Sequence, residues 1–109
     1  MAEQGSLMGN AAVLANLVGY QDGAVVSRTL AEKTAGTITM FAFDAGHGLS
    51  EHSAPFDAFV YAIDGESEIS ISGQKNRVIE GQMITMPANE PHSIRAVTPF
   101  KMLLVMIRA

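Results

Sequence analysis

The sequence contains no cysteine and no tryptophan, and only 6% of its residues are aromatic. Without cysteine the chain can form no disulfide, offer no thiolate to a metal and use no cysteine nucleophile. Basic residues are also few, because 7 Lys and Arg stand against 11 Asp and Glu, a formal net charge of −4. Binding to nucleic acid needs a basic surface for the phosphates, so we expect no nucleic-acid partner.

Long apolar runs are missing as well. The longest uninterrupted run is the six residues from Met102 to Ile107, whereas a membrane-spanning helix needs about 20. The first residues are polar and acidic, and they lack the basic start and apolar core of a secretory signal peptide. We therefore expect a cytoplasmic protein with no membrane association.

The chain has 109 residues, and 48% of them are hydrophobic. This composition excludes a disordered chain and suits one folded domain. Residues 1–12 show no periodicity and predict a flexible N-terminus. Residues 13–36 predict an extension made of a short helix and a strand. The helix is expected over 11–18, with Asn10 as its cap and Gly19 as its end. Residues 37–109 predict the main barrel.

From residue 24 onward the pattern is that of short strands divided by turns. Asp64 and Gly65 lie between two strand patterns and predict a hairpin, since this dipeptide suits a turn with two positive φ angles. Eight or nine strands with a turn every six to ten residues favour an all-β sandwich or barrel. The expected strands cover residues 24–30, 37–43, 58–63, 66–72, 76–80, 82–86, 93–97 and 100–108.

Two segments with regular spacing contain histidine. The first has Gly46, five residues, His52 and, further on, Gly65. The second has Gly81, five residues, Pro87, four residues and then His92. These spacings resemble the two motifs of the cupin family over residues 37–108, most closely its small single-domain conserved-barrel members. The resemblance implies an all-β, RmlC-like jelly roll (a double-stranded β-helix) with two antiparallel sheets.

The sequence departs from the metal-binding form of these motifs, in which three histidines and one glutamate hold one metal. Ala54 stands at the second histidine position and Ala58 at the glutamate position. The resemblance therefore carries over only His52 and His92 as ligands. His47 lies in a glycine-flanked loop and is a candidate third ligand. Such a set would suit a divalent ion of Zn, Ni, Fe, Mn or Cu, and the alternative is a barrel without metal.

Three functions are open at this point. The first is the binding of a small molecule in an apolar pocket, with the two histidines as its polar groups. The second is a metal-dependent enzyme of the dioxygenase, isomerase or decarboxylase type. The third is a purely structural role. The two alanines shorten side chains inside the barrel and favour the first function, with a pocket expected from Val60, Ala62, Met83, Thr85 and Ile94.

The sequence also predicts a homodimer. Residues 13–30 contain more apolar side chains than one small barrel needs, so this segment is expected to lie across a partner subunit. No nucleophile elbow, phosphate-binding loop or paired-carboxylate motif is present. Any acid–base chemistry would therefore fall to the histidines.

Overall fold

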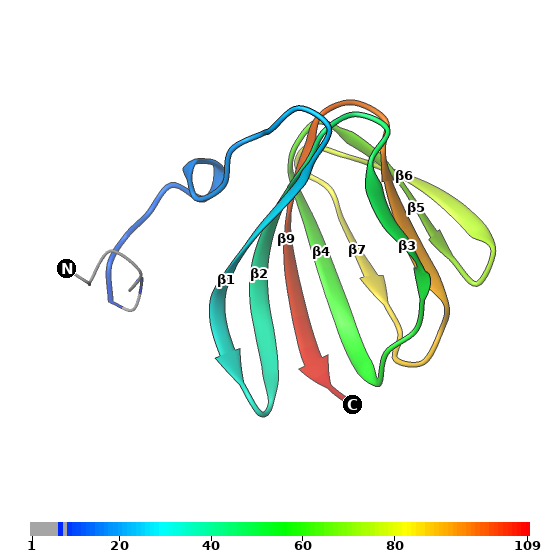
Figure 1. The fold of residues 1–109 in the computed structure, drawn as a ribbon. Helices are drawn as coiled ribbons and strands as arrows, with labels where there is room; N and C mark the ends of the chain where they lie inside the picture. The colour runs from blue at the N-terminus through cyan, green and yellow to red at the C-terminus, as the bar shows by residue number, and fades with distance from the viewer. Residues whose placement is uncertain (1–6, 8) are drawn as a thin grey trace.

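A computed structural model describes residue 7 and residues 9–109; the other residues of the predicted flexible N-terminus lie outside this range. Within the described part, nine strands form two antiparallel sheets that face each other (Figure 1). The larger sheet contains, in spatial order, β1 (Val25–Lys33), β2 (Gly36–Phe43), β9 (Phe100–Arg108), β4 (Phe56–Asp64) and β7 (Met83–Met86). The smaller contains β3 (Gly48–His52), β8 (His92–Ala96), β5 (Glu66–Ile71) and β6 (Gln74–Ile79). This arrangement confirms the predicted all-β jelly roll.

The core lies between the two sheets, because strands alternate apolar inward residues with outward ones. In β4 the inward residues Ala58, Val60 and Ala62 are buried, while Asp57 and Tyr61 are exposed. The same core contains large side chains from both sheets, including Phe43, Ile69, Phe100 and Met102. Filling by side chains makes this barrel a packed core.

The predicted hairpin at Asp64 and Gly65 is wrong. Strand β4 pairs with β7 and β9, whereas β5 pairs with β6 and β8, so the turn carries the chain from one sheet to the other. Only Gly65 has a positive φ, of 83°. The turn with two positive φ angles joins β5 to β6, at Ser72 (49°) and Gly73 (84°).

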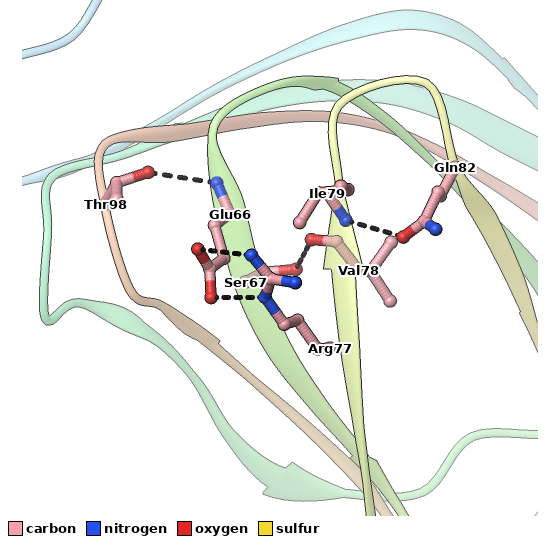
Figure 2. Close-up of polar contacts among 7 residues, drawn as sticks. All are labelled: Glu66, Ser67, Arg77, Val78, Ile79, Gln82 and Thr98. Carbon is pink, nitrogen blue, oxygen red and sulfur yellow. Dashed lines mark hydrogen bonds and ion pairs between the residues drawn. The ribbon is translucent and has the colours of Figure 1, made fainter.

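Side-chain contacts join the β5–β6 hairpin to its surroundings, as Figure 2 shows. Arg77 Nε donates to Glu66 Oε2 at 2.8 Å, and the Glu66 main-chain N–H donates to Thr98 Oγ1 at 3.0 Å. Ser67 is fully buried, and its hydroxyl donates to the Val78 carbonyl at 3.1 Å. The hydroxyl therefore has a partner in the apolar core, which removes the cost of burying it.

The predicted helix over residues 11–18 is replaced by a single turn of 3₁₀ helix, η2 (Leu14–Asn16). An isolated α-helix of eight residues is marginal in water, and Asn10 does not cap this turn, which begins after Val13. Leu14 and Val18 instead pack on the outer face of the larger sheet. No helix in the described ranges is long and apolar enough to span a bilayer.

Candidate functional site

His52 and His92 meet where strand β3 ends and strand β8 begins. Their Cα atoms are direct cross-strand partners, and their ring centroids lie 4.4 Å apart with the rings at 67° to each other. His92 is buried, with 8% of its surface exposed, whereas His52 is exposed. The structure thus brings together the two histidines that the motif spacing singled out.

A β-bulge in β3 makes this meeting possible. Leu49 pairs with Ile94 and His52 pairs with His92, so three steps along β3 match two steps along β8. Without the extra residue Glu51 would face His92, because side chains alternate along a strand. The bulge therefore puts the second imidazole on the same face as the first.

The loop before His92 is held by contacts from three other segments. The Ala88 N–H donates to Asp57 Oδ1 at 2.9 Å, and the Asn89 N–H donates to the Ala54 carbonyl at 2.8 Å. Ser72 Oγ donates to Glu90 Oε1. These bonds fix the position from which the buried imidazole enters the site.

The cupin resemblance places Asn89 at a position of the second motif where the family has glycine, and the φ of Asn89 is +68°. Besides glycine, asparagine is among the residues that most readily adopt the left-handed region. The departure at this position therefore preserves the shape of the loop.

Both imidazoles are oriented by the same local bond. The Nδ1 of His52 lies 2.8 Å from the Ser50 carbonyl oxygen, and the Nδ1 of His92 lies 3.1 Å from the Glu90 carbonyl oxygen. Each carbonyl belongs to the residue two positions earlier. A carbonyl only accepts hydrogen bonds, so each Nδ1 carries a proton and donates. In a neutral ring oriented in this way, the Nε2 atom keeps its lone pair for a ligand.

Burial favours the neutral form of His92. Desolvation is the largest cause that lowers the pKa of His92 below its ordinary value of 6.5, and the nearby His52 lowers it further. The bond to the Glu90 carbonyl acts in the opposite direction but does not outweigh burial. At neutral pH His92 therefore presents a hydrogen-bond acceptor.

His47 is not brought to this pair. Its main chain pairs with Ala96, since the Ala96 N–H donates to the His47 carbonyl at 2.8 Å. His52 lies five residues further, at the far end of β3, which corresponds to a distance on the order of 15 Å. The imidazole of His47 is exposed and lies near Asp44, whose pKa it helps to lower after the larger effect of the bonds from Gly23 and Ala45.

Gly46 and Gly48, on either side of His47, meet requirements of the main chain and do not position the imidazole. A Cβ atom on Gly48 would lie 1.8 Å from the Ile94 carbonyl oxygen, so only glycine permits the close approach of β3 to β8. Gly46 has a φ of +85°, in the left-handed region. The glycines on either side of His47 therefore shape the main chain and do not bring its imidazole to His52 and His92.

The available donors do not fit a metal held by protein ligands. Among the described residues, no group of three or more His, Asp or Glu side chains lies close enough to hold one ion. Ala58, at the family's glutamate position, is 5% exposed and belongs to the apolar core. Two imidazoles alone fall short of the three protein ligands that a catalytic zinc site has.

The pocket predicted inside the barrel needs correction at strand β7. Met83 is 48% exposed and Thr85 is exposed, because Ile84 and Met86 are the residues of β7 that pair with inward-facing Val60 and Ala58. The remaining predicted pocket residues, Val60, Ala62 and Ile94, are packed in the core. A hollow of about 230 Å³ lies beside His92 and is lined also by Glu51, Ser70, Gly73, Lys75, Pro91 and Ser93.

Sequence reasoning missed the two carbonyl groups, of Ser50 and Glu90, that orient the imidazoles. Every residue has a main-chain carbonyl, so the residue type does not show which carbonyl will accept a hydrogen bond from a histidine. The only available signal was that each lies two residues before its histidine.

Known proteins resemble this chain over most of its length. A conserved protein of unknown function from Streptococcus pyogenes shares 39% identity, with 93% of this chain and 89% of that chain covered and a TM-score of 0.89. A cupin superfamily protein from Desulfitobacterium hafniense shares 28% identity over 88% of each chain, with a TM-score of 0.85. A cupin 2 conserved barrel domain protein from Leptotrichia buccalis shares 37% identity over 86% of this chain and 46% of that one, with a TM-score of 0.84.

No curated protein matches the chain. The sequence of residues 39–107 matches the family described as the cupin domain. This segment runs from β2 to β9 and contains both histidines of the pair. The chain therefore belongs to the cupin family.

Proposed function

We propose that the protein binds a small organic molecule at the His52–His92 end of the barrel, with the two imidazoles accepting hydrogen bonds from it. The observation that carries this proposal is the pair of bonds from Nδ1 to main-chain carbonyls, which leaves both Nε2 lone pairs unused by those bonds. The lowered pKa of His92 supports the proposal, because it favours the neutral ring, which accepts a hydrogen bond at neutral pH. The ligand class that fits is a compound with hydroxyl or ammonium donors, such as a sugar or a hydroxy acid.

An NMR titration that follows the chemical shifts of the backbone amides tests this binding. The probes are glucose, glycerol, lactate and ethanolamine, added to ¹⁵N-labelled protein. We expect at least one of them to shift the amides of Ser50–Ser53 and Glu90–Ser93, and His52→Ala to abolish the shift. His47→Ala is the matched control, because it removes an exposed imidazole outside the site, and it should leave the shift unchanged. No shift from any probe, or an equal shift in His52→Ala, would contradict the proposal.

The alternative function is a metal-dependent enzyme of the dioxygenase, isomerase or decarboxylase type. The same two Nε2 atoms could serve as ligands, but the remaining ligands would have to come from water or substrate. Metal analysis of the purified wild type, His52→Ala and His47→Ala separates the two. We expect the wild type to contain much less than one metal ion per chain. One ion per chain in the wild type and in His47→Ala, lost in His52→Ala, would favour the enzyme.

A further inference from the structure

The outer face of the smaller sheet contains a polar hollow that the proposed function does not use. Ile69 is buried in the core, so Ser70, the next residue of β5, faces outward. The cross-strand partners of Ser70 are Ser93 on β8 and Lys75 on β6. The hollow of about 230 Å³ beside His92 is lined by all three residues of this row. Its floor therefore belongs to the outer surface of the sheet and not to the core.

Small side chains form the middle of the hollow, and charged side chains stand at its two ends. Ser70 and Ser93 are half-buried, whereas Glu51 on β3 and Lys75 on β6 are exposed. Strands β3 and β6 are the two edges of the smaller sheet. Three inter-strand spacings, about 14 Å, therefore separate the main chains that carry the carboxylate and the ammonium group.

The two charged groups of the hollow are unpaired. In the next outward row of the same sheet, Arg95 Nε lies 3.8 Å from Glu68 Oε1, so charges there neutralise each other. In the part of the chain that the structure describes, neither Glu51 nor Lys75 forms an ion pair. The hollow thus holds one negative and one positive group apart, with space for a ligand between them.

The two serine hydroxyls between these charges are also available. Within the described ranges, the hydroxyls of Ser70 and Ser93 make no hydrogen bond with another protein group. A hydroxyl can both donate and accept. The hollow therefore offers a cation, two hydroxyls and an anion in one row, which suits a ligand that is polar along its whole length.

One end of the hollow is fixed by bonds within the protein. The Ser72 N–H donates to the Pro91 carbonyl at 2.8 Å, and Ser72 Oγ donates to Glu90 Oε1. These bonds join the β5–β6 turn to the loop before His92, and Gly73 of the turn and Pro91 of the loop both line the hollow. A preformed site loses less entropy when it binds a ligand.

We propose that this hollow binds a short zwitterion of the dipeptide class, with its carboxylate at Lys75, its ammonium group at Glu51 and its peptide group over the two serines. A volume of about 230 Å³ holds roughly eight water molecules of about 30 Å³ each, which matches the size of glycylglycine. An extended dipeptide spans about 7 Å, and the two charged side chains cover the remaining distance to their strands. The site is separate from the one proposed for the histidine pair, since it needs neither Nε2 atom.

An NMR titration of ¹⁵N-labelled protein with glycylglycine tests the proposal. We expect a saturable shift of the amides of Ser70, Lys75 and Ser93. N-acetylglycine lacks the ammonium group and glycylglycinamide lacks the carboxylate, so each should bind about fivefold more weakly or worse. No saturable shift at tens of millimolar glycylglycine would overturn the proposal, as would equal dissociation constants for the three compounds.

Three variants locate the binding. Lys75→Gln should raise the dissociation constant of glycylglycine about fivefold, because it removes the partner of the carboxylate. Arg77→Gln is the matched control, since it removes the same charge from the same strand, at a residue that pairs with Glu66 outside the hollow (Figure 2). An equal effect of both substitutions would contradict the contact with Lys75. His52→Ala should keep the affinity, and a loss of glycylglycine binding in this variant would assign the ligand to the histidine pair and overturn the separate site.

Discussion

The direction in which each imidazole points its lone pair depends on one main-chain carbonyl. Ser50 and Glu90 supply these carbonyls to His52 and His92. The motif spacing predicted both histidines as candidate ligands. It supplied no third ligand. It could not predict which ring nitrogen is free, because the main-chain acceptors and the bulge in β3 leave no trace in residue identity.

The lowered pKa of His92 predicts a loss of stability in acid. In the unfolded chain His92 binds a proton as the pH falls through 6.5, while in the folded chain burial delays that step. The free energy of unfolding should therefore be constant above about pH 7 and should fall below pH 6.5, until the folded form also binds the proton. Urea unfolding from roughly pH 5 to 8, above the range of most carboxylates, measures this.

The control for this pH dependence is a pair of single substitutions. His92→Gln should reduce the slope below pH 6.5, and His47→Gln should leave it unchanged. An unaltered slope in His92→Gln would show that burial of this imidazole does not cause the effect.

Turns and strand faces show where sequence patterns succeed and where they fail. The strand positions of β2, β4, β8 and β9 follow alternation or apolar content, and the structure confirms them. The turn at Gly65 was assigned to a hairpin, because local residues cannot tell whether the next strand joins the same sheet. The predicted orientation of β7 is wrong, because a strand of four residues alternates too few times to show which of its faces points inward.

Gly65 is expected to be the most sensitive of the turn glycines. A Cβ atom there would lie 1.9 Å from the Pro99 carbonyl oxygen, and the φ is +83°. Gly65→Ala should therefore lower the free energy of unfolding by about 2 kcal/mol or more. Gly73→Ala is the matched control, because its φ is +84° and nothing lies within 4 Å of its Cβ position. An equal loss in both variants, measured by urea unfolding, would show that the contact with Pro99 contributes nothing.

The facing of β7 predicts unequal effects for its two methionines. Met86 is 2% exposed, so Met86→Ala should cost about 2–5 kcal/mol. Met83 is 48% exposed, and Met83→Ala should change stability by no more than about 0.5 kcal/mol. Urea unfolding of both variants measures these losses. A larger loss from Met83→Ala would mean that the strand faces the other way.

The whole barrel should not depend on metal for its stability. Its core is apolar, and the described residues supply no set of three metal ligands. We expect dialysis against EDTA to leave the thermal unfolding midpoint unchanged. A clear fall in the midpoint, reversed by one added divalent ion, would show that a metal contributes to the folded state.

The most direct test concerns the protons on the two imidazoles. Long-range ¹H–¹⁵N correlation spectra of labelled protein at pH 7.5 distinguish a protonated ring nitrogen from an unprotonated one. His52→Ala and His47→Ala assign the three sets of signals. We predict that His52 and His92 both carry their proton on Nδ1 and leave Nε2 unprotonated. A proton on Nε2 of either ring would remove the acceptor pair and contradict the proposed binding site.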